Sequence, residues 1–203
     1  MQQQQVIRWH NTREFKFGAG IGALVLTYAG AAWAFVALAN RAGMPRWEFG
    51  VFALPVLTLT ALSVVRLVAV AKLPIQTLLG AEATERARQG RRMGILFALV
   101  FATEAALVAG TAVILARSSR PLLIPVAVMA IFGLHLVPLA RIFSMPIYMV
   151  TGSLLAGLAA SSLLIAEEPL RIFILAMVAA VVLWASAARV LAAYTIVQSI
   201  SSK

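Results

Sequence analysis

Long runs of apolar residues, separated by short polar or charged segments, make up most of the chain. A helix that crosses about 30 Å of hydrocarbon needs roughly 20 apolar residues. Six stretches meet this requirement: Phe17–Asn40, Trp47–Ala71, Met93–Ala116, Pro121–Phe143, Pro146–Ala166 and Leu170–Ile200. Transmembrane barrels show alternating segments of about ten residues instead. The pattern therefore predicts an all-α, polytopic membrane protein with six transmembrane helices.

The six stretches predict a single transmembrane domain over residues 17–200, preceded by a cytoplasmic segment over residues 1–16. The apolar region of a signal peptide usually has about 7–15 residues. The run from Gly18 to Ala39 is longer, so we expect it to be retained in the protein as the first helix. The longest connection spans residues 72–92. It is predicted to be a cytoplasmic loop, either a short amphipathic turn at the interface or a plain basic loop.

Basic residues are distributed unequally between the two sets of helix ends. One set holds Arg8, Arg13, Lys16, Lys72, Arg86, Arg88, Arg91, Arg92, Arg141 and Lys203, and the other holds only Arg41, Arg46, Arg117, Arg120 and Arg171. Short loops rich in Lys and Arg stay on the cytoplasmic side. Both termini are therefore predicted to be cytoplasmic, in a cell (inner) membrane.

Composition narrows the function classes. The chain is 62% hydrophobic and 12% charged, whereas soluble domains have about 45–50% apolar and about 25% charged residues. The net charge of +10 predicts attraction to anionic lipids at the cytoplasmic face rather than nucleic-acid binding, because no soluble basic domain is present. Cysteine is absent and only His135 of the two histidines lies in an apolar stretch, so we expect no metal and no cofactor such as a bis-His haem.

The even-numbered stretches resemble one another. With an offset of 48 residues, Pro121-Leu122 aligns with Pro169-Leu170, and Ala140-Arg141-Ile142 aligns with Ala188-Arg189-Val190. The second stretch ends similarly, with Val65-Arg66-Leu67. This similarity is typical of repeats, and suggests three related helical hairpins.

Arg66, Arg141 and Arg189 each lie near the cytoplasmic end of an apolar stretch. Their long side chains could simply extend into water at the interface. Alternatively, they line a basic cytoplasmic vestibule or contact lipid phosphates.

Glu104 is the most informative residue, because it stands eleven residues into the third stretch, near the bilayer midplane. An acidic residue at this depth costs about 2.5–3.5 kcal/mol on insertion scales, so it either stays protonated or faces a partner. Intramembrane ionisable residues are functional candidates by default. A purely structural role stays open.

His135 is the natural partner of Glu104. It lies fourteen residues into the fourth stretch, which runs back toward the cytoplasm, so the two residues differ in depth by roughly 5–8 Å. Adjacent antiparallel helices would bring them within reach of one another as a proton relay. A neutral imidazole that merely bonds two helices is the structural alternative. Pro138 lacks an amide and frees the Leu134 carbonyl, as in ion or substrate sites built on broken helices.

The segment Gly133-Leu134-His135-Leu136-Val137-Pro138 resembles a G-x-H-x-x-P motif of small bacterial integral membrane proteins of uncharacterised function. The resemblance implies that His135, Pro138 and Arg141 form one site, and it assigns no activity.

These features predict a protein that transports or senses a small solute or ion through a buried Glu104/His135 centre, with Pro138 beside it. No catalytic motif such as a GxSG serine element, a P-loop or HExxH is present, so we do not expect an enzyme. The alternative is a non-catalytic structural or assembly subunit of a membrane complex, and a further one is an intramembrane enzyme acting on lipid. The predicted partners are the lipid bilayer and a second copy of the chain in a homo-oligomer.

Overall fold

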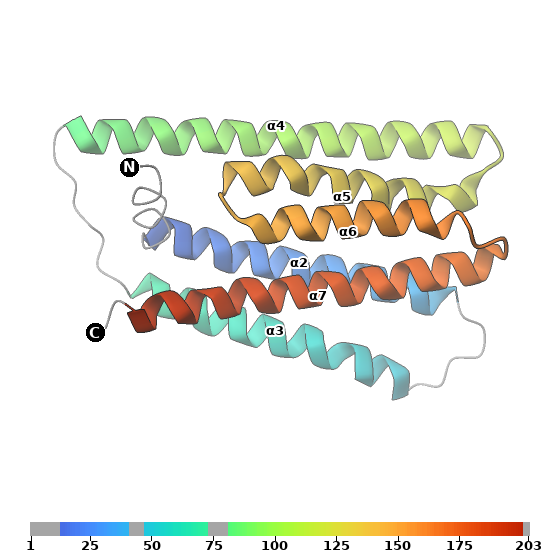
Figure 1. The fold of residues 1–203 in the computed structure, drawn as a ribbon, viewed down its shortest axis with the longest axis horizontal. Helices are drawn as coiled ribbons and strands as arrows, with labels where there is room; N and C mark the ends of the chain where they lie inside the picture. Colours follow the sequence, from blue (N-terminus) through green and yellow to red (C-terminus); the bar gives the residue numbers. More distant parts are fainter. Residues whose placement is uncertain (1–12, 41–46, 73–80, 201–203) are drawn as a thin grey trace. The chain divides into compact units, whose positions relative to one another are not determined.

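The computed structural model describes residues 13–40, 47–72 and 81–200, and 92% of these residues are helical, without a strand among them. The elements are α2 (Arg13–Ala39), α3 (Trp47–Ala71), α4 (Ala81–Arg117), the 3₁₀ helix η1 (Pro121–Leu123), α5 (Ile124–Ile142), α6 (Pro146–Ser162) and α7 (Glu168–Ile200). The all-α prediction is confirmed for this part of the chain (Figure 1).

Five helices in the described part are long and apolar enough to cross a membrane. Their spanning segments are Phe15–Ala39, Gly50–Ala71, Gly90–Arg117, Pro121–Ile142 and Glu168–Ala193. The sixth apolar helix, α6, has only 17 residues, which corresponds to about 25 Å against roughly 30 Å of hydrocarbon. The chain therefore has the helices of a multi-pass membrane protein, with one of them shorter than the predicted stretch 146–166.

The early end of α6 has a local cause. The hydroxyl groups of Ser161 and Ser162 donate hydrogen bonds to the carbonyls three residues earlier, Leu158 and Ala159. Such side-chain bonds compete with the helical backbone ladder. From Leu163 to Ile165 each amide donates to the carbonyl three residues before it, so the chain tightens into a turn.

The connection predicted over residues 72–92 is helical from Ala81 onward, where α4 begins. This stretch is rich in Ala, Glu, Gln and Arg, which have high helix propensity. The predicted loop is thus wrong for its second half. Residues 73–80 of the predicted loop lie outside the described residues.

The helices divide into two compact units. The first contains α2, α3 and α7, and the second contains α4, η1, α5 and α6. The first two predicted hairpins are present as the packed pairs α2–α3 and α4–α5. In the second unit α5 lies between α4 and α6 (Figure 1), with its larger contact on α6.

Trp184 of α7 contacts both other helices of the first unit. Its Nε1–H donates a hydrogen bond of 3.1 Å to the Thr27 carbonyl of α2. Gly30 makes room for the indole, because a Cβ atom there would lie 2.6 Å from Nε1. The indole also meets the Phe52 ring of α3 at a centroid distance of 6.5 Å. One side chain therefore ties α7 to both other helices.

In the second unit, α5 and α6 cross where two glycines meet. A Cβ atom on Gly133 would lie 2.7 Å from the Gly152 carbonyl oxygen, and one on Gly152 would collide with the Gly133 carbonyl. Small residues permit such close backbone approach in membranes. The contact is made by this pair, whereas nothing lies within 4 Å of a Cβ atom built on the exposed Gly157.

Both sharp turns of this unit use the sequence Ser-x-Pro. Ser119 and Ser144 adopt positive φ angles of 57° and 53°. The amide three residues past the last helical residue donates to the carbonyl five residues before it, Arg120 to Leu115 and Met145 to Ala140. This is the Schellman arrangement of helix C-termini. The prolines that follow, Pro121 and Pro146, begin the next helices, where a missing amide costs nothing.

The surface of α4 is apolar and open. No residue in its most apolar 18-residue segment is buried within the chain. Large side chains such as Leu99 and Ile114 are 58% and 65% exposed. Soluble monomers rarely expose contiguous apolar patches of more than a few hundred Å². The lengths, composition and exposed faces of the helices are those of an integral membrane protein.

Candidate functional site: a glutamate and a histidine in an apolar groove

The chain direction of α4 and α5 brings Glu104 and His135 of the second unit together. The Glu104 carboxyl oxygen Oε1 lies 3.3 Å from His135 Nδ1. The side chains are 14% and 7% exposed, respectively. Their adjacency follows from the short Ser-x-Pro turn, which folds α5 back along α4 so that residues at similar depth meet. The structure thus brings Glu104 and His135 into contact.

His135 Nδ1 also lies 2.7 Å from the backbone carbonyl oxygen of Phe132, one turn earlier in α5. A carbonyl oxygen only accepts hydrogen bonds, so Nδ1 must carry the hydrogen at this distance. The neutral imidazole is therefore the Nδ1–H tautomer, which donates mainly to Phe132 and faces the Glu104 carboxyl as a second acceptor. The other ring nitrogen, Nε2, is left with its lone pair.

Aromatic rings flank the imidazole on both helices. The rings of Phe101 in α4 and Phe132 in α5 lie 5.5 Å and 5.0 Å from it, both nearly perpendicular to it. Phe101 in turn contacts Phe97, which reaches Phe143 near the end of α5. These contacts fix the orientation of the ring and enclose the Glu104–His135 pair in apolar surroundings.

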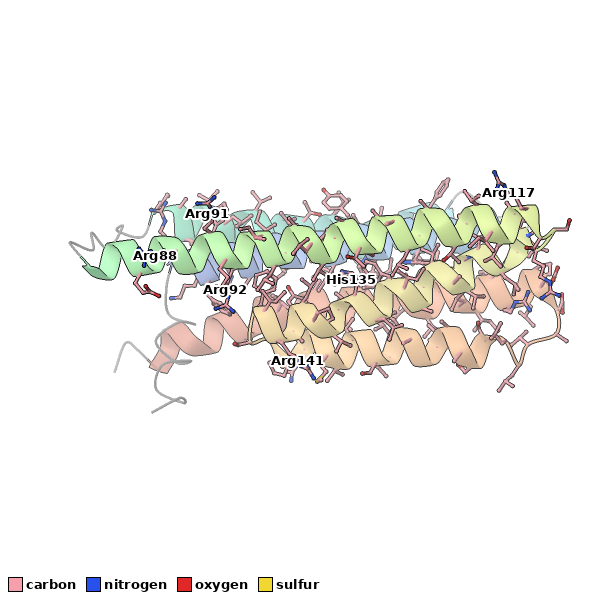
Figure 2. The ribbon with its side chains drawn as sticks, turned by 90° about the horizontal axis from the view of Figure 1, so that it is seen from above. Arg88, Arg91, Arg92, Arg117, His135 and Arg141 are labelled. Atoms are coloured by element: carbon pink, nitrogen blue, oxygen red, sulfur yellow. The ribbon has the colours of Figure 1, made fainter. Side chains whose placement is uncertain are left out.

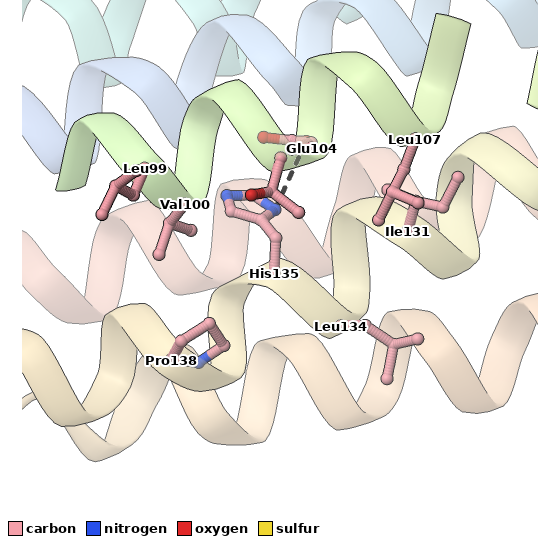
Figure 3. A pocket seen from close by; sticks show the side chains of 9 residues that line it. Leu99, Val100, Glu104, Leu107, Ile131, Leu134, His135 and Pro138 are labelled. Atoms are coloured by element: carbon pink, nitrogen blue, oxygen red, sulfur yellow. Dashed lines mark ion pairs between the residues drawn. The ribbon is translucent and has the colours of Figure 1, made fainter. Parts of the chain in front are cut away.

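A groove of about 330 Å³ runs along the pair between α4 and α5 (Figure 3). Its wall is formed by Leu99, Val100, Thr103, Glu104, Leu107, Ile131, Leu134, His135 and Pro138. Leu99, Leu107 and Leu134 are each more than half exposed, so they form an open rim. Volumes of about 300–1,000 Å³ with mostly apolar walls and a few polar groups are typical of ligand sites.

The groove shows which predicted site residues the fold assembles. Glu104, His135 and Pro138 all line it, whereas Arg141 is not among its lining residues. The apolar lining residues were missed by reasoning from the sequence. Helical spacing indicates several of these apolar residues, because positions three or four residues from Glu104 or His135 lie on the same face of the helix.

The predicted arginines have separate locations. Arg66 and Arg189 belong to the first unit, where Arg66 is half-buried and Arg189 exposed, while Arg141 is exposed on α5 of the second. Figure 2 shows Arg88, Arg91 and Arg92 toward one end of α4 and Arg117 at the other, with Arg141 of α5 toward the former end. Within the second unit, one end of α4 is thus strongly basic, and His135 lies between this end and the end with Arg117.

Two protein ligands are too few for a closed metal site. Within residues 13–40, 47–72 and 81–200, no group of three or more His, Asp or Glu side chains lies close enough to hold a metal ion. The chemistry that Glu104 and His135 offer by themselves is proton exchange and hydrogen bonding.

The chain matches no protein-family model, and neither a curated protein nor a solved structure is detectably similar to it.

Proposed function

We propose that this protein is a six-span inner-membrane protein that transports or senses a small solute or ion, with Glu104 and His135 as its protonatable centre. The observation that carries the proposal is the 3.3 Å contact between Glu104 Oε1 and His135 Nδ1 beside an apolar groove. Ionisable groups are costly inside membranes and are found there mainly where they serve transport or signalling.

The hydrogen-bond pattern supports a relay of protons. A proton that arrives at the free Nε2 converts the ring to imidazolium, and the Nδ1 proton can then pass to Glu104 Oε1. This transfer leaves the hydrogen on Nε2 and breaks the bond from Nδ1 to the Phe132 carbonyl. The ring returns to its starting tautomer by proton exchange with water, in which Nε2 loses its proton and Nδ1 takes one up. The Phe132 carbonyl favours this tautomer, because it accepts a hydrogen bond only from Nδ1–H.

The proposed topology has six membrane segments, with α6 as the short fifth one and both termini in the cytoplasm. A short helix is accommodated by local thinning of the bilayer or by neighbouring helices. The basic end of α4, with Arg88, Arg91 and Arg92 exposed there, supports a cytoplasmic location for that end. At this face Arg66, Arg141 and Arg189 would meet anionic lipid phosphates.

Proton flux in liposomes tests this function. The purified protein is reconstituted around a pH-sensitive dye, and the decay of an imposed pH gradient is followed with potassium and valinomycin present to balance charge. We expect the wild type to dissipate the gradient at least about tenfold faster than Glu104→Gln, since the amide cannot take up the proton. Glu85→Gln removes an exposed carboxyl from the same helix and should retain wild-type flux.

Wild-type flux in folded Glu104→Gln protein would contradict the proposal. If the wild type itself leaks no faster than empty liposomes, while the variant loses stability, the pair acts as a structural bond. The assembly-subunit alternative then predicts a partner that co-purifies in stoichiometric amount.

A further inference from the structure

We propose that the groove between α4 and α5 binds a lipophilic amine from the bilayer, with its ammonium group on Glu104. This inference rests on the proposed Glu104/His135 centre and names a class of substrate for it. It uses three observations: the hydrogen-bonding character of the site, the apolar wall and the exposed rim.

The polar groups that the site presents to a ligand are mainly acceptors. His135 Nδ1–H already faces the Phe132 carbonyl and Glu104 Oε1. Within the described residues neither Nε2 nor Glu104 Oε2 takes part in a further hydrogen bond. A lone pair and a carboxylate oxygen are complementary to a ligand that donates hydrogen bonds and carries positive charge. An anion or a ligand with acceptors alone would leave these groups unsatisfied.

The other residues of the groove wall favour a ligand with an apolar body. Leu99, Val100, Leu107, Ile131, Leu134 and Pro138 contribute hydrocarbon, and Thr103 adds one hydroxyl group. An inorganic cation would find one carboxylate and no ring of oxygen ligands here. A primary amine with an aryl or alkyl tail would satisfy the carboxylate and also fill the groove of about 330 Å³.

The rim indicates the route of entry. Leu99, Leu107 and Leu134 are 58%, 52% and 61% exposed, on helices whose apolar length spans the membrane. A ligand that partitions into lipid can therefore reach the groove sideways between these leucines. The tail stays in apolar surroundings throughout, and only the head group has to exchange its hydration for Glu104.

The test uses phenylbutylamine as the probe and phenylbutanol, which has the same tail without the charge, as the comparison. Binding is measured by equilibrium dialysis against the full-length protein in nanodiscs, with empty nanodiscs subtracting partition into lipid. We expect the amine to bind at least about tenfold more tightly than the alcohol, because an ion pair in an apolar groove is largely unscreened. Equal binding of the two compounds would overturn the proposal.

Two substitutions locate the site. Glu104→Gln should weaken amine binding by about tenfold or more and leave alcohol binding unchanged. Leu134→Trp should block the groove for both compounds, whereas Leu154→Trp, at a similarly exposed position of α6, should not. Retained amine binding in Glu104→Gln, or equal loss in both tryptophan variants, would contradict the proposal.

A measurement on the wild type does not depend on how the variants fold. Methyl NMR signals of Leu99, Leu107 and Leu134 should shift on titration with the amine, while those of Leu154 and Leu164 stay in place. Shifts confined to the latter two would place the ligand elsewhere and overturn the proposal. Proton flux that depends on Glu104 without amine binding would refute this inference alone, and amine binding without such flux would refute the proposed function alone.

Discussion

The two faces of α5 pack against their neighbouring helices in opposite ways. Toward α6, Gly133 meets Gly152 so closely that neither position has room for a Cβ atom. Toward α4, the helix presents Leu134, His135 and Pro138, and a groove remains. One helix therefore has a close glycine contact on one side and, on the other, an open apolar groove that holds Glu104 and His135.

The two contacts of α5 show how a membrane protein can keep a site both fixed in geometry and accessible. Glycine contacts give van der Waals packing without polar groups, which is the main source of helix association where lipid replaces water. They hold α5 in place while its other face carries the costly carboxyl and imidazole groups. The groove would lose its geometry if the glycine contact were lost.

The largest effect is expected from filling the glycine contact. Gly152→Val should destabilise the protein by about 1–3 kcal/mol, because the new side chain collides with the Gly133 backbone and the helices must separate. Gly157→Val on the same helix should be nearly neutral, since nothing lies within 4 Å of a Cβ atom there. Steric-trapping measurements of unfolding in bicelles compare the two, and equal stability would refute the contact.

An intermediate effect is expected from the Glu104–His135 pair. Glu104→Leu and His135→Leu should each cost about 0.6–2 kcal/mol, because each removes the polar contact between the two helices. The double variant should then cost less than the sum of the two, with a coupling energy of about 0.6–1.7 kcal/mol. The same unfolding measurement yields this cycle, and additive costs would show that the two groups do not interact.

A smaller effect is expected from the first unit, where an uncharged hydrogen bond joins the helices. Trp184→Phe removes the donor to the Thr27 carbonyl and should cost about 0.6 kcal/mol. Proton flux should be unchanged, because no ionisable group of the proposed centre is touched. Tyr28→Phe removes a hydroxyl from a half-exposed ring and provides the control. Loss of flux in Trp184→Phe would show that the centre is not confined to α4 and α5.

The smallest effect, and one of opposite sign, is expected at the turn into α6. Ser144 has a φ of 53°, which glycine adopts without a steric penalty, so Ser144→Gly should stabilise the protein by about 0.5–1 kcal/mol. Ala160→Gly, inside α6, should destabilise by a similar amount. A destabilising Ser144→Gly would indicate that the serine side chain stabilises this turn.

The sequence predicted the helical fold because apolar length is a direct measure of what a bilayer requires. The bounds of α3 agree with the predicted stretch 47–71. The ends of α4 and α6 differ, since hydropathy records where a segment can be buried in lipid and not where helical hydrogen bonding stops. The helix formers after Ala81 and the serine hydroxyls before Leu163 decide these two ends.

Depth and chain direction indicated that Glu104 and His135 meet if their helices pack side by side, but not that these helices are neighbours. The partner of Nδ1 could not be predicted, because a carbonyl is present at every residue and only the rotamer of His135 selects that of Phe132. The contact between Gly133 and Gly152 could not be predicted from the sequence either. Small residues recur throughout these helices, and nothing in the sequence distinguishes the two that meet from others such as the exposed Gly157.

Nitrogen NMR of the His135 ring tests directly whether Glu104 and His135 act as one protonatable centre. In the wild type the neutral ring should give the signals of the Nδ1–H tautomer, and in Glu104→Gln the midpoint of its titration should move, because the neighbouring carboxyl no longer titrates with it. Glu85→Gln should leave the curve unchanged. Superimposable curves for wild type and Glu104→Gln, or a neutral ring with its hydrogen on Nε2, would contradict the account.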